Sequence, residues 1–360
     1  MNSALTFLSN NWQRFGLERY GAPGQMTSVV ITPRFHASSH VVFLVLRKKQ
    51  AQPVLVVKAP RLAGAGETLI REAANLRAVQ SSRDGGFDSV PRVIAFERRW
   101  DRPILVETAI VGRLLDPPTV RSDTVHACET IGDWLAEVQL ASRSSAARVD
   151  SGWFERLIAQ PLSYLEKSVA LSADEEALLA RTRRLAETLK GLDIPLVVEH
   201  GDLSHPNLML REGNSPSATG AGVVDWELAD AQGLPACDLF FFLTYVTFAL
   251  HQARENRRHL EAFHEAFFGV EPWIDPYVRK YAQRIDLPFQ ALAPLFVLTW
   301  VRYLVGLLVR LHGAAPRVQI PDAETTAWLR NNRYYALWRH AMDHLDEFSS
   351  HWQQATRMSE

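Results

Sequence analysis

Apolar positions follow two different patterns along this chain. In the N-terminal part, short runs rich in Val, Leu, Ile and Phe are separated by turn-like segments, and these runs are strand candidates: 26–32, 40–47, 53–59, 91–97 and 103–108. Between the third run and the fourth, Leu69, Ala73, Leu76 and Val79 repeat with a helical period. The pattern therefore predicts an antiparallel sheet with one helix, residues 66–80, inserted in it.

After Gly112 the apolar positions recur mostly with helical spacing. The predicted helices are 121–142, 155–170, 173–190, 236–250, 252–268, 276–284, 290–312 and 322–346. Two short strand candidates, 208–211 and 222–225, flank a polar turn between them. This order predicts an α+β, bilobal fold with a small antiparallel-sheet N-lobe, residues 1–109, and a larger, mainly helical C-lobe, residues 110–360.

Composition excludes several classes of protein. A chain of 360 residues is too long for one ordinary core and fits two lobes. Hydrophobic content of 47% with 22% charged residues excludes disorder, and a net charge of -1 argues against a nucleic-acid-binding protein, which usually carries a basic excess. The two cysteines cannot form a disulfide framework, so a reduced, cytoplasmic setting is expected.

No segment predicts a membrane anchor or a signal peptide. The N-terminus lacks the basic start and the long apolar core of a signal peptide. Residues 287–311 are the most apolar segment, but Pro288, Pro294, Arg302 and Arg310 interrupt it. We therefore expect a buried helix there rather than a membrane span.

The clearest chemical pattern lies between His200 and Asp225. Asp202 stands five residues before Asn207, and Asp225 follows an apolar run. Phosphoryl transfer with Mg²⁺ needs such a set, because one carboxylate takes the proton of the attacking hydroxyl while an amide oxygen and another carboxylate hold the metal against the nucleotide phosphates. We interpret Asp202 as the catalytic base and Asn207 and Asp225 as magnesium ligands. Taken alone, Asp202 would also suit a turn-capping role, with Ser204 in the turn.

This stretch resembles the aminoglycoside phosphotransferase and choline kinase group, small-molecule kinases with a protein-kinase-like fold. The resemblance rests on His-Gly-Asp at 200–202, where protein kinases usually have Arg in the middle, and on Asp-Trp-Glu at 225–227, where they have Asp-Phe-Gly. It is sharp here and fainter over the rest of the first 250 or so residues. It implies a bilobal kinase-like fold, ATP or GTP with Mg²⁺, and a hydroxyl of a small molecule as acceptor.

Other polar residues near the motif have less defined roles. His200 resembles the family histidine that braces the loop, whereas Ser204 and His205 either approach the phosphates or substrate or face solvent. Glu227 either assists the metal or substrate or lies at the surface. A zinc site at the two histidines is not expected, because no further ligand has metal spacing. Asp238 is interpreted as structural, capping the apolar helix that follows and bonding the loop backbone.

Lys58 and Glu72 match the pair that orients the phosphate-binding lysine of kinases. Lys58 ends an apolar strand candidate, and Glu72 lies in the predicted helix. Both residue types are also common on solvated faces. Glu67 and Arg71 leave open which glutamate pairs with Lys58.

Two further parts of a nucleotide site follow from the resemblance. The phosphate-covering loop is expected at 33–39, where Ser38 and Ser39 would contact the β-phosphate; the loop has no glycine, unlike that of protein kinases. The segment containing Glu107 and Ala109 resembles the hinge whose backbone reads the adenine edge. No G-x-x-x-x-G-K-[ST] sequence occurs, which excludes a Walker-type ATPase.

The C-terminal half has no acidic cluster of the kind that binds polycationic aminoglycosides. It is rich in aromatic residues and arginine instead: Trp273, Tyr277, Trp300, Arg302, Tyr303, Arg310, Trp328, Tyr334, Tyr335 and Trp338. We expect most of these to pack between helices. A few facing the cleft would suit a neutral or anionic acceptor that stacks on rings, such as a sugar.

The predicted function is transfer of the γ-phosphate of ATP or GTP to a hydroxyl of a small molecule. A catalytically weak nucleotide-binding scaffold is one alternative, indicated by the glycine-free loop. A protein kinase is another, although Gly201 and the absence of an evident activation segment before Asp238 argue against it. The sequence names neither the acceptor nor the oligomeric state.

Overall fold

The chain forms two compact units that are not continuous halves of the sequence. The computed structural model describes residues 3–31, 40–61, 66–99, 102–145, 152–211, 220–253, 256–312 and 322–350. The N-terminal unit contains Met1–Leu114 and Asn207–Ala229, and the C-terminal unit contains Leu115–Pro206 and Asp230–Glu360. The motif between His200 and Asp225 therefore contributes residues to both units. The predicted lobe boundary at residue 109 stays a prediction.

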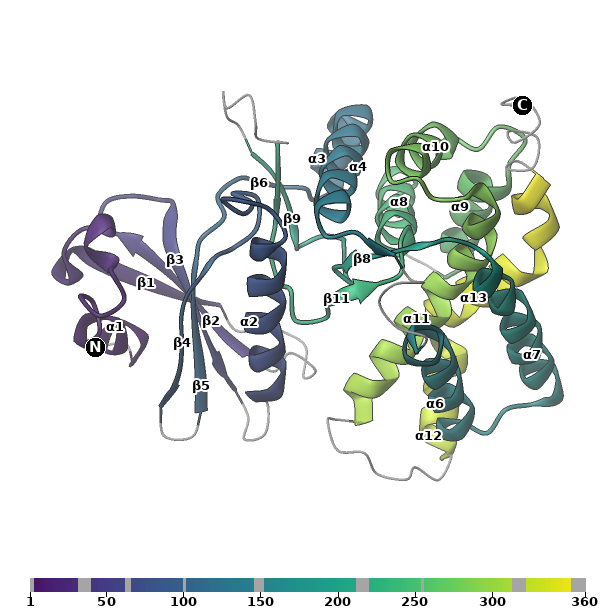
Figure 1. The fold of residues 1–360 in the computed structure, drawn as a ribbon, viewed down its shortest axis with the longest axis horizontal. Helices are drawn as coiled ribbons and strands as arrows, with labels where there is room; N and C mark the ends of the chain where they lie inside the picture. Colours follow the sequence, from purple (N-terminus) through teal and green to yellow (C-terminus); the bar gives the residue numbers. More distant parts are fainter. Residues whose placement is uncertain are drawn as a thin grey trace. The chain divides into compact units, whose positions relative to one another are not determined.

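The N-terminal unit is built on a five-stranded antiparallel sheet with the order β1-β2-β3-β5-β4 (Figure 1). Its main elements are α1 (Ser3–Asn10), β1 (Met26–Ile31), β2 (His40–Arg47), β3 (Pro53–Pro60), α2 (Gly66–Ser81), β4 (Val93–Arg99) and β5 (Arg102–Thr108). The predicted order of three strands, one helix and two strands is confirmed. Helix α1 was not predicted.

The two faces of this sheet carry different kinds of side chain. One face packs against the N-terminal segment, where Val57 and Val106 share a core cluster with Trp12. Side chains alternate along a strand, so Lys58 and Glu107, each one residue further along, point to the other face. Helix α2 packs against β3, β4 and β5. The alternation thus separates an apolar face from a face that carries charged side chains.

A small sheet completes the N-terminal unit. It has the order β10-β9-β6 and consists of β6 (Arg113–Leu114), β9 (Leu208–Leu210) and β10 (Ala221–Val223). The two strand candidates near the motif are confirmed as an antiparallel pair, β9 with β10. One detail was wrong: the second strand ends at Val223, so Asp225 lies beyond it rather than on its end.

The C-terminal unit is mainly helical, with a second small sheet of order β11-β8-β7. The helices are α3 (Pro117–Ser122), α4 (Thr124–Ala141), α6 (Gln160–Ser168), α7 (Ala173–Glu187), α8 (Cys237–Leu250), α9 (Asn256–Phe268), α10 (Asp275–Arg284), α11 (Leu292–His312), α12 (Ala323–Asn331) and α13 (Arg333–Asp343). The strands are β7 (Ser144–Ser145), β8 (Pro195–Glu199) and β11 (Asp230–Gly233). A π-helical turn, Glu155–Ala159, leads into α6.

Capping residues divide two of the predicted helices. The prediction of one helix over 322–346 was wrong, because Asn332 ends α12 and its side chain accepts a hydrogen bond of 2.9 Å from the Tyr334 amide at the start of α13. Asp123 separates α3 from α4 in the same way, bonding the His126 amide at 3.0 Å. Helix α9 begins at Asn256 rather than at 252, where Gln252 has a positive φ of 47° in the preceding turn.

Helix α11 is a long and strongly apolar helix of the C-terminal unit. Together with the short turn before it, Phe289–His312 is long and apolar enough to cross a membrane by length and composition. However, 67% of its most apolar stretch is buried inside the structure, as in the core helices of globular proteins. Trp300 on this helix is fully buried among aromatic residues of α9 and α11.

Candidate active site

Lys58 is the centre of a buried charged cluster in the N-terminal unit. Its ammonium group donates a hydrogen bond to Glu72 of α2. It also lies 3.5 Å from Oε1 of Glu107 and 3.6 Å from Oδ1 of Asp225. The expected pairing of Lys58 with Glu72, rather than with Glu67, is thus present. The contact with the Glu107 side chain was not foreseen from sequence.

The electrostatics of the cluster follow from one cation among three carboxyl groups. Burial by itself lowers the pKa of Lys58, but Glu107, Glu72 and Asp225 outweigh it and hold that pKa well above its usual range. Burial raises the pKa of Glu107 to about 8, against the opposing effect of Lys58. Lys58 is therefore firmly charged at neutral pH.

Asn207 and Asp225 lie at the same end of the β9–β10 pair. Asn207 immediately precedes β9, and the amide of Val224, just after β10, donates to the Asn207 carbonyl at 3.0 Å. Asp225 has a φ of 67°, in the left-handed region that few non-glycine residues adopt; Asp and Asn adopt it more often than most, and such residues cluster at functional sites. The hairpin thus presents an amide oxygen and a carboxylate together.

The chemistry of these donors fits Mg²⁺, which prefers hard oxygen ligands. Among the described residues, none donates a hydrogen bond to Oε2 of Glu72 or Oε2 of Glu107, although both oxygens are buried. Buried oxygens without donors favour a nearby cation. Asn207 and Asp225 are the residues of this unit that would hold the metal.

Trp226 fixes the backbone beside Asp225. Its side chain is fully buried, and its indole N–H donates to the Val223 carbonyl at 3.1 Å. Its backbone N–H donates to Oε1 of Glu72 at 3.3 Å. Glu72 therefore links Lys58 to the segment that carries Asp225. Glu227, the next residue, lies 3.5 Å from Nδ1 of His40, so its carboxylate has a partner within this unit.

Asp202 lies in the catalytic-loop segment of the C-terminal unit. Its Oδ1 accepts a hydrogen bond of 3.2 Å from the hydroxyl of Tyr303 on α11 and one of 3.4 Å from the hydroxyl of Ser204. Its backbone N–H donates to Nδ1 of buried His200 at 3.3 Å. His205 is exposed, and the peptide bond between His205 and Pro206 is cis.

Asp238 holds the start of this loop. Its carboxylate accepts hydrogen bonds from the backbone N–H groups of His200 at 2.6 Å and Gly201 at 2.9 Å. Burial and the neighbouring Glu199 raise the pKa of Asp238 to about 7, while the two N–H donors act in the opposite direction. The expectation that Asp238 bonds the loop backbone is confirmed. The expectation that it caps helix α8 was wrong, because Ala236 holds the N-cap position.

A buried ion pair behind the loop was missed from sequence. Glu199, the last residue of β8, accepts hydrogen bonds of 2.9 and 3.0 Å from the guanidinium of Arg302. It also accepts one of 3.0 Å from the Leu234 amide. From the sequence, Arg302 is one of two arginines among the residues expected to pack between helices or to face the cleft, and no local signal links it to a residue 103 positions away.

Aromatic rings surround the hydroxyl that bonds Asp202. Tyr303 packs against Phe241 at a ring-centroid distance of 4.4 Å and against Tyr334 at 4.5 Å. The expectation of helix packing is confirmed for Trp300 and Trp338, which are almost fully buried. Tyr303 and Tyr334 instead form an aromatic wall beside the carboxylate.

Some predicted site residues are not tested by these contacts. Ser38 and Ser39 lie outside the described residues. Glu107 and Ala109 were expected to read adenine through their backbone, and this stays a prediction. The amide of Ala109 donates to the Val54 carbonyl at 3.3 Å, so a ligand at that amide would compete with this bond.

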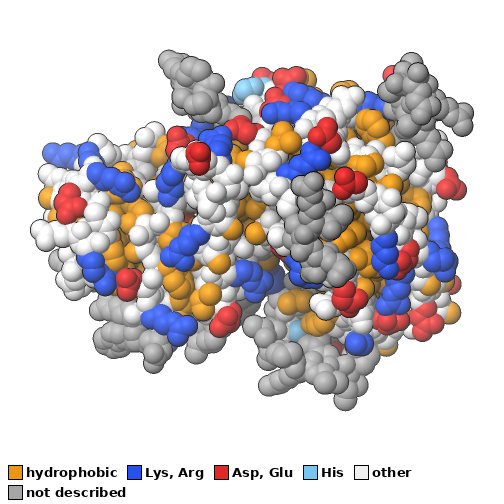
Figure 2. Space-filling model, in the orientation of Figure 1, with side chains coloured by type: hydrophobic (Ala, Val, Ile, Leu, Met, Phe, Trp, Pro, Cys, Tyr) orange, Lys and Arg blue, Asp and Glu red, His pale blue; other side chains and the backbone are white. Residues whose placement is uncertain are grey.

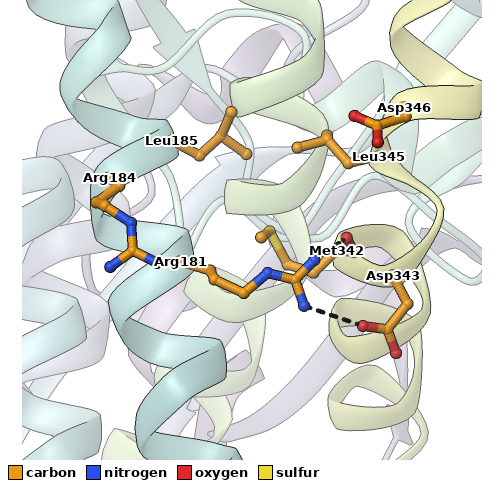
Figure 3. A pocket seen from close by; sticks show the side chains of 7 residues that line it. All are labelled: Arg181, Arg184, Leu185, Met342, Asp343, Leu345 and Asp346. Carbon is orange, nitrogen blue, oxygen red and sulfur yellow. Dashed lines mark hydrogen bonds and ion pairs between the residues drawn. The ribbon is translucent and has the colours of Figure 1, made fainter.

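A separate pocket of about 230 Å³ lies between α7 and the end of α13 (Figure 3). Its lining includes Arg181, which pairs with Asp343 at 3.3 Å and donates to the Met342 carbonyl at 2.8 Å. None of the predicted site residues lines it. We therefore assign the chemistry to the motif residues and not to this pocket.

Three solved structures are similar to this chain over most of its length. A solved structure described as a putative fructosamine-3-kinase from Haemophilus somnus 129PT is 14% identical over 93% of this chain and 97% of its own, with a TM-score of 0.50. The GDP complex of wild-type aminoglycoside 2'-phosphotransferase-IIIa is 14% identical over 95% of this chain and 99% of its own, with a TM-score of 0.46. A type VIII aminoglycoside-3'-phosphotransferase is 19% identical over 94% of this chain and 98% of its own, with a TM-score of 0.42.

A search of curated proteins found no match. The sequence profile of the phosphotransferase enzyme family matches residues 32–277, which include every predicted site residue. The predicted family resemblance, the bilobal kinase-like fold and the assignment as a phosphotransferase are confirmed. This chain belongs to the phosphotransferase enzyme family.

Proposed function

We propose that this protein transfers the γ-phosphate of ATP or GTP to a hydroxyl group of a small molecule. Asp202 is the catalytic base, Asn207 and Asp225 hold Mg²⁺, and Lys58 binds the nucleotide phosphates. The metal would neutralise phosphate charge, which is its usual contribution to this reaction. The rest of the catalysis is positioning by side chains of this chain.

One observation carries the proposal: Lys58 contacts both the buried carboxylate of Glu72 and the carboxylate of Asp225, whose side chain is 44% exposed and so open to a ligand. Lys58 and Glu72 come from the sheet and α2, whereas Asp225 comes from a segment more than 150 residues further on, as the contact between Glu72 and Trp226 shows. A structural lysine needs one counter-charge. A lysine beside a second carboxylate at a strained residue is the arrangement that binds a metal–phosphate group.

Asp202 is placed to orient and deprotonate a hydroxyl. Its Oδ1 is held by Tyr303 and Ser204, and these bonds fix the direction of the carboxylate. The loop beneath it is held by Asp238 and His200. A base held in this way loses little entropy when the acceptor binds.

The acceptor site next to Asp202 favours a neutral or anionic molecule. The neighbouring side chains are the rings of Tyr303, Tyr334 and Phe241, and Arg310 lies close enough to act on the pKa of Tyr303. Carboxylates that would attract a polycation are not among these neighbours in the described part of the C-terminal unit. A sugar ring or a glycosylated compound stacks well on such rings.

The same proposal covers the compartment and the partners. Both cysteines are free and buried, which suits a reduced cytoplasm. On the face that Figure 2 shows, basic and acidic side chains are interspersed rather than gathered in one basic patch. We therefore propose that neither nucleic acid nor membrane is a partner.

A nucleotide-binding scaffold with weak activity is the second candidate. Glu107 favours it, because a third carboxyl group beside Lys58 opposes the approach of phosphate when it is ionised. A scaffold would bind Mg²⁺–nucleotide and transfer phosphate to no acceptor.

The deciding experiment measures transfer of labelled γ-phosphate from ATP, and then from GTP, into a small-molecule extract with Mg²⁺ present. Asp202→Asn removes the base and should lower turnover by about a hundredfold or more, while nucleotide binding stays close to wild type. Asp193→Asn, in an exposed loop, is the matched control and should keep full activity.

A labelled metabolite made by wild type and by Asp193→Asn, but not by Asp202→Asn, supports the kinase and delivers its acceptor. Equal turnover in all three proteins would remove Asp202 from the role of base. Nucleotide binding with no labelled metabolite from any acceptor-containing extract would favour the scaffold.

A further inference from the structure

Three histidines of the C-terminal unit gather outside the candidate active site. His264 lies on α9, His340 lies in the last turn of α13, and His344 is the C-cap of that helix. One ring nitrogen of each lies within 4.8 Å of those of the other two. His340 and His344 are four residues apart, so they share one face of the helix.

A hydrogen bond to the backbone fixes which ring nitrogen of His344 has a lone pair. Nδ1 of His344 lies 3.0 Å from the carbonyl of His340, and a ring nitrogen that faces a carbonyl must carry the proton. Nε2 of His344 then keeps its lone pair. A histidine oriented through its other nitrogen in this way is typical of metal ligands.

His264 and His340 approach each other through their ring nitrogens. Nδ1 of His264 lies 3.1 Å from Nε2 of His340. Two imidazole nitrogens bound to one tetrahedral zinc ion are separated by about 3.3 Å, because each Zn–N bond is about 2.0–2.1 Å long. The contact is a hydrogen bond, so one of the two nitrogens carries a proton; a shared metal needs the pair only about 0.2 Å further apart, with that proton moved to the other nitrogen of its ring.

The surroundings favour the neutral form of His340 and leave the cluster accessible. Burial, followed by the neighbouring His344 and His264, lowers the pKa of His340 to about 4. Neutral imidazole is the form that binds metal. Phe268 stacks on His264 at a centroid distance of 5.5 Å, while all three histidines are only half-buried, so an ion and a water molecule can reach them.

We propose that His264, His340 and His344 form a binding site for a divalent transition metal of the Zn²⁺ type, with solvent as the remaining ligand. Three imidazoles select such ions over Mg²⁺, which prefers oxygen ligands. The rings of His340 and His344 stack at 4.1 Å, so ligation turns one of them about its side-chain torsions. The metal would join α9 to the end of α13. His264 and His340 are 76 positions apart in the sequence.

The test titrates the metal-free full-length protein with Co²⁺ and Zn²⁺ while Mg²⁺ is kept in excess. One equivalent of Co²⁺ should give the visible absorption of a tetrahedral nitrogen-bound ion, and Zn²⁺ should displace it and raise the apparent Tm. His264→Gln and His344→Gln should each weaken binding at least tenfold and remove the absorption. His126→Gln on α4, an exposed histidine outside the cluster, is the matched control and should bind as wild type does.

A measurement on the wild-type protein alone tests the proposal even if a variant does not fold. X-ray absorption of the Zn²⁺ form should show a shell dominated by imidazole nitrogens. No one-equivalent binding by wild type overturns the proposal. Binding of equal strength in wild type, His264→Gln and His344→Gln overturns it as well, because the ion then lies elsewhere.

Discussion

At the scale of single residues, the catalytic segment depends on backbone conformations that few residues tolerate. Gly201 has a φ of 80°, and its N–H donates to Asp238 at 2.9 Å. A side chain at this position would disfavour that conformation and weaken the bond. This explains in physical terms why the motif carries Gly between His200 and Asp202. Asp225 also has a positive φ, 67°, and Asp is one of the few residue types besides glycine that adopt this region readily.

Tyr303 is a positioning residue for Asp202, and its substitution should affect turnover. Tyr303→Phe removes one hydrogen bond to a charged group, which contributes about 1.5–3 kcal/mol, so kcat should fall roughly tenfold or more while the KM for the acceptor changes little. Tyr303→Leu also removes the ring and should raise that KM. Steady-state kinetics with the identified acceptor measure both. Unchanged kcat in Tyr303→Phe would contradict the role.

At the scale of elements, side-chain caps and ion pairs decide where helices begin and how they join. The hydrophobic period runs through Asn332 and Asp123 without a break, so it predicts longer helices than are formed. Glu175 both caps a helix and joins two helices. It completes the capping box of α7 with Ser172, and it accepts hydrogen bonds of 2.9 Å from Arg330 of α12.

Glu175 should make the stability of the C-terminal unit depend on acid pH. The bonds from Arg330, with smaller contributions from Ser172 and Tyr335, lower the pKa of Glu175 to about 2. A carboxyl whose pKa is depressed on folding stabilises the fold above its unfolded pKa, and this stabilisation is lost as pH falls from about 4.5 towards 2. Glu175→Gln should therefore cost about 1–2 kcal/mol near neutral pH, moderated by the exposure of Arg330, and less at about pH 3.5.

Urea unfolding at the two pH values measures this difference. Glu176→Gln is the matched control, because Glu176 is an exposed carboxylate in the same first turn of α7. Its effect should be small at both pH values. A cost of Glu175→Gln that does not change with pH would contradict the assignment.

At the scale of the whole molecule, one functional motif is divided between two compact units. Asn207 and Asp225 belong to the N-terminal unit with Lys58, whereas Asp202 belongs to the C-terminal unit. The chain passes from one unit to the other directly after Pro206. The five positions that separate Asp202 from Asn207 in the sequence therefore span the point where the chain leaves one unit and enters the other.

Binding of nucleotide and Mg²⁺ should stabilise the folded protein as a whole. A ligand at about a hundred times its Kd adds about 2.7 kcal/mol, so the apparent Tm should rise by several degrees. Asp225→Asn should lose the part of this rise that requires Mg²⁺, and Asp193→Asn should keep it. Differential scanning calorimetry with and without EDTA measures both. If Mg²⁺ and nucleotide leave the apparent Tm of the wild-type protein unchanged, that result would argue against the nucleotide site.

The sequence by itself determined the features that depend on local periodicity and spacing. Short apolar runs between turn-like segments predicted the five-stranded sheet, the helical period predicted α2, and the motif selected Asp202, Asn207 and Asp225 as candidates. The pairing of Lys58 with Glu72 could also be predicted from the sequence, because α2 follows strand β3 directly in the chain.

Only the tertiary structure decided the contacts between distant residues. Tyr303 bonds Asp202, which is 101 positions away, and Arg302 bonds Glu199, which is 103 positions away. Glu107 faces Lys58 because side chains alternate between the two faces of β5. None of these leaves a periodic signal, because each depends on how whole helices and strands pack. The histidine cluster is of the same kind, since α9 and α13 meet only in the folded C-terminal unit.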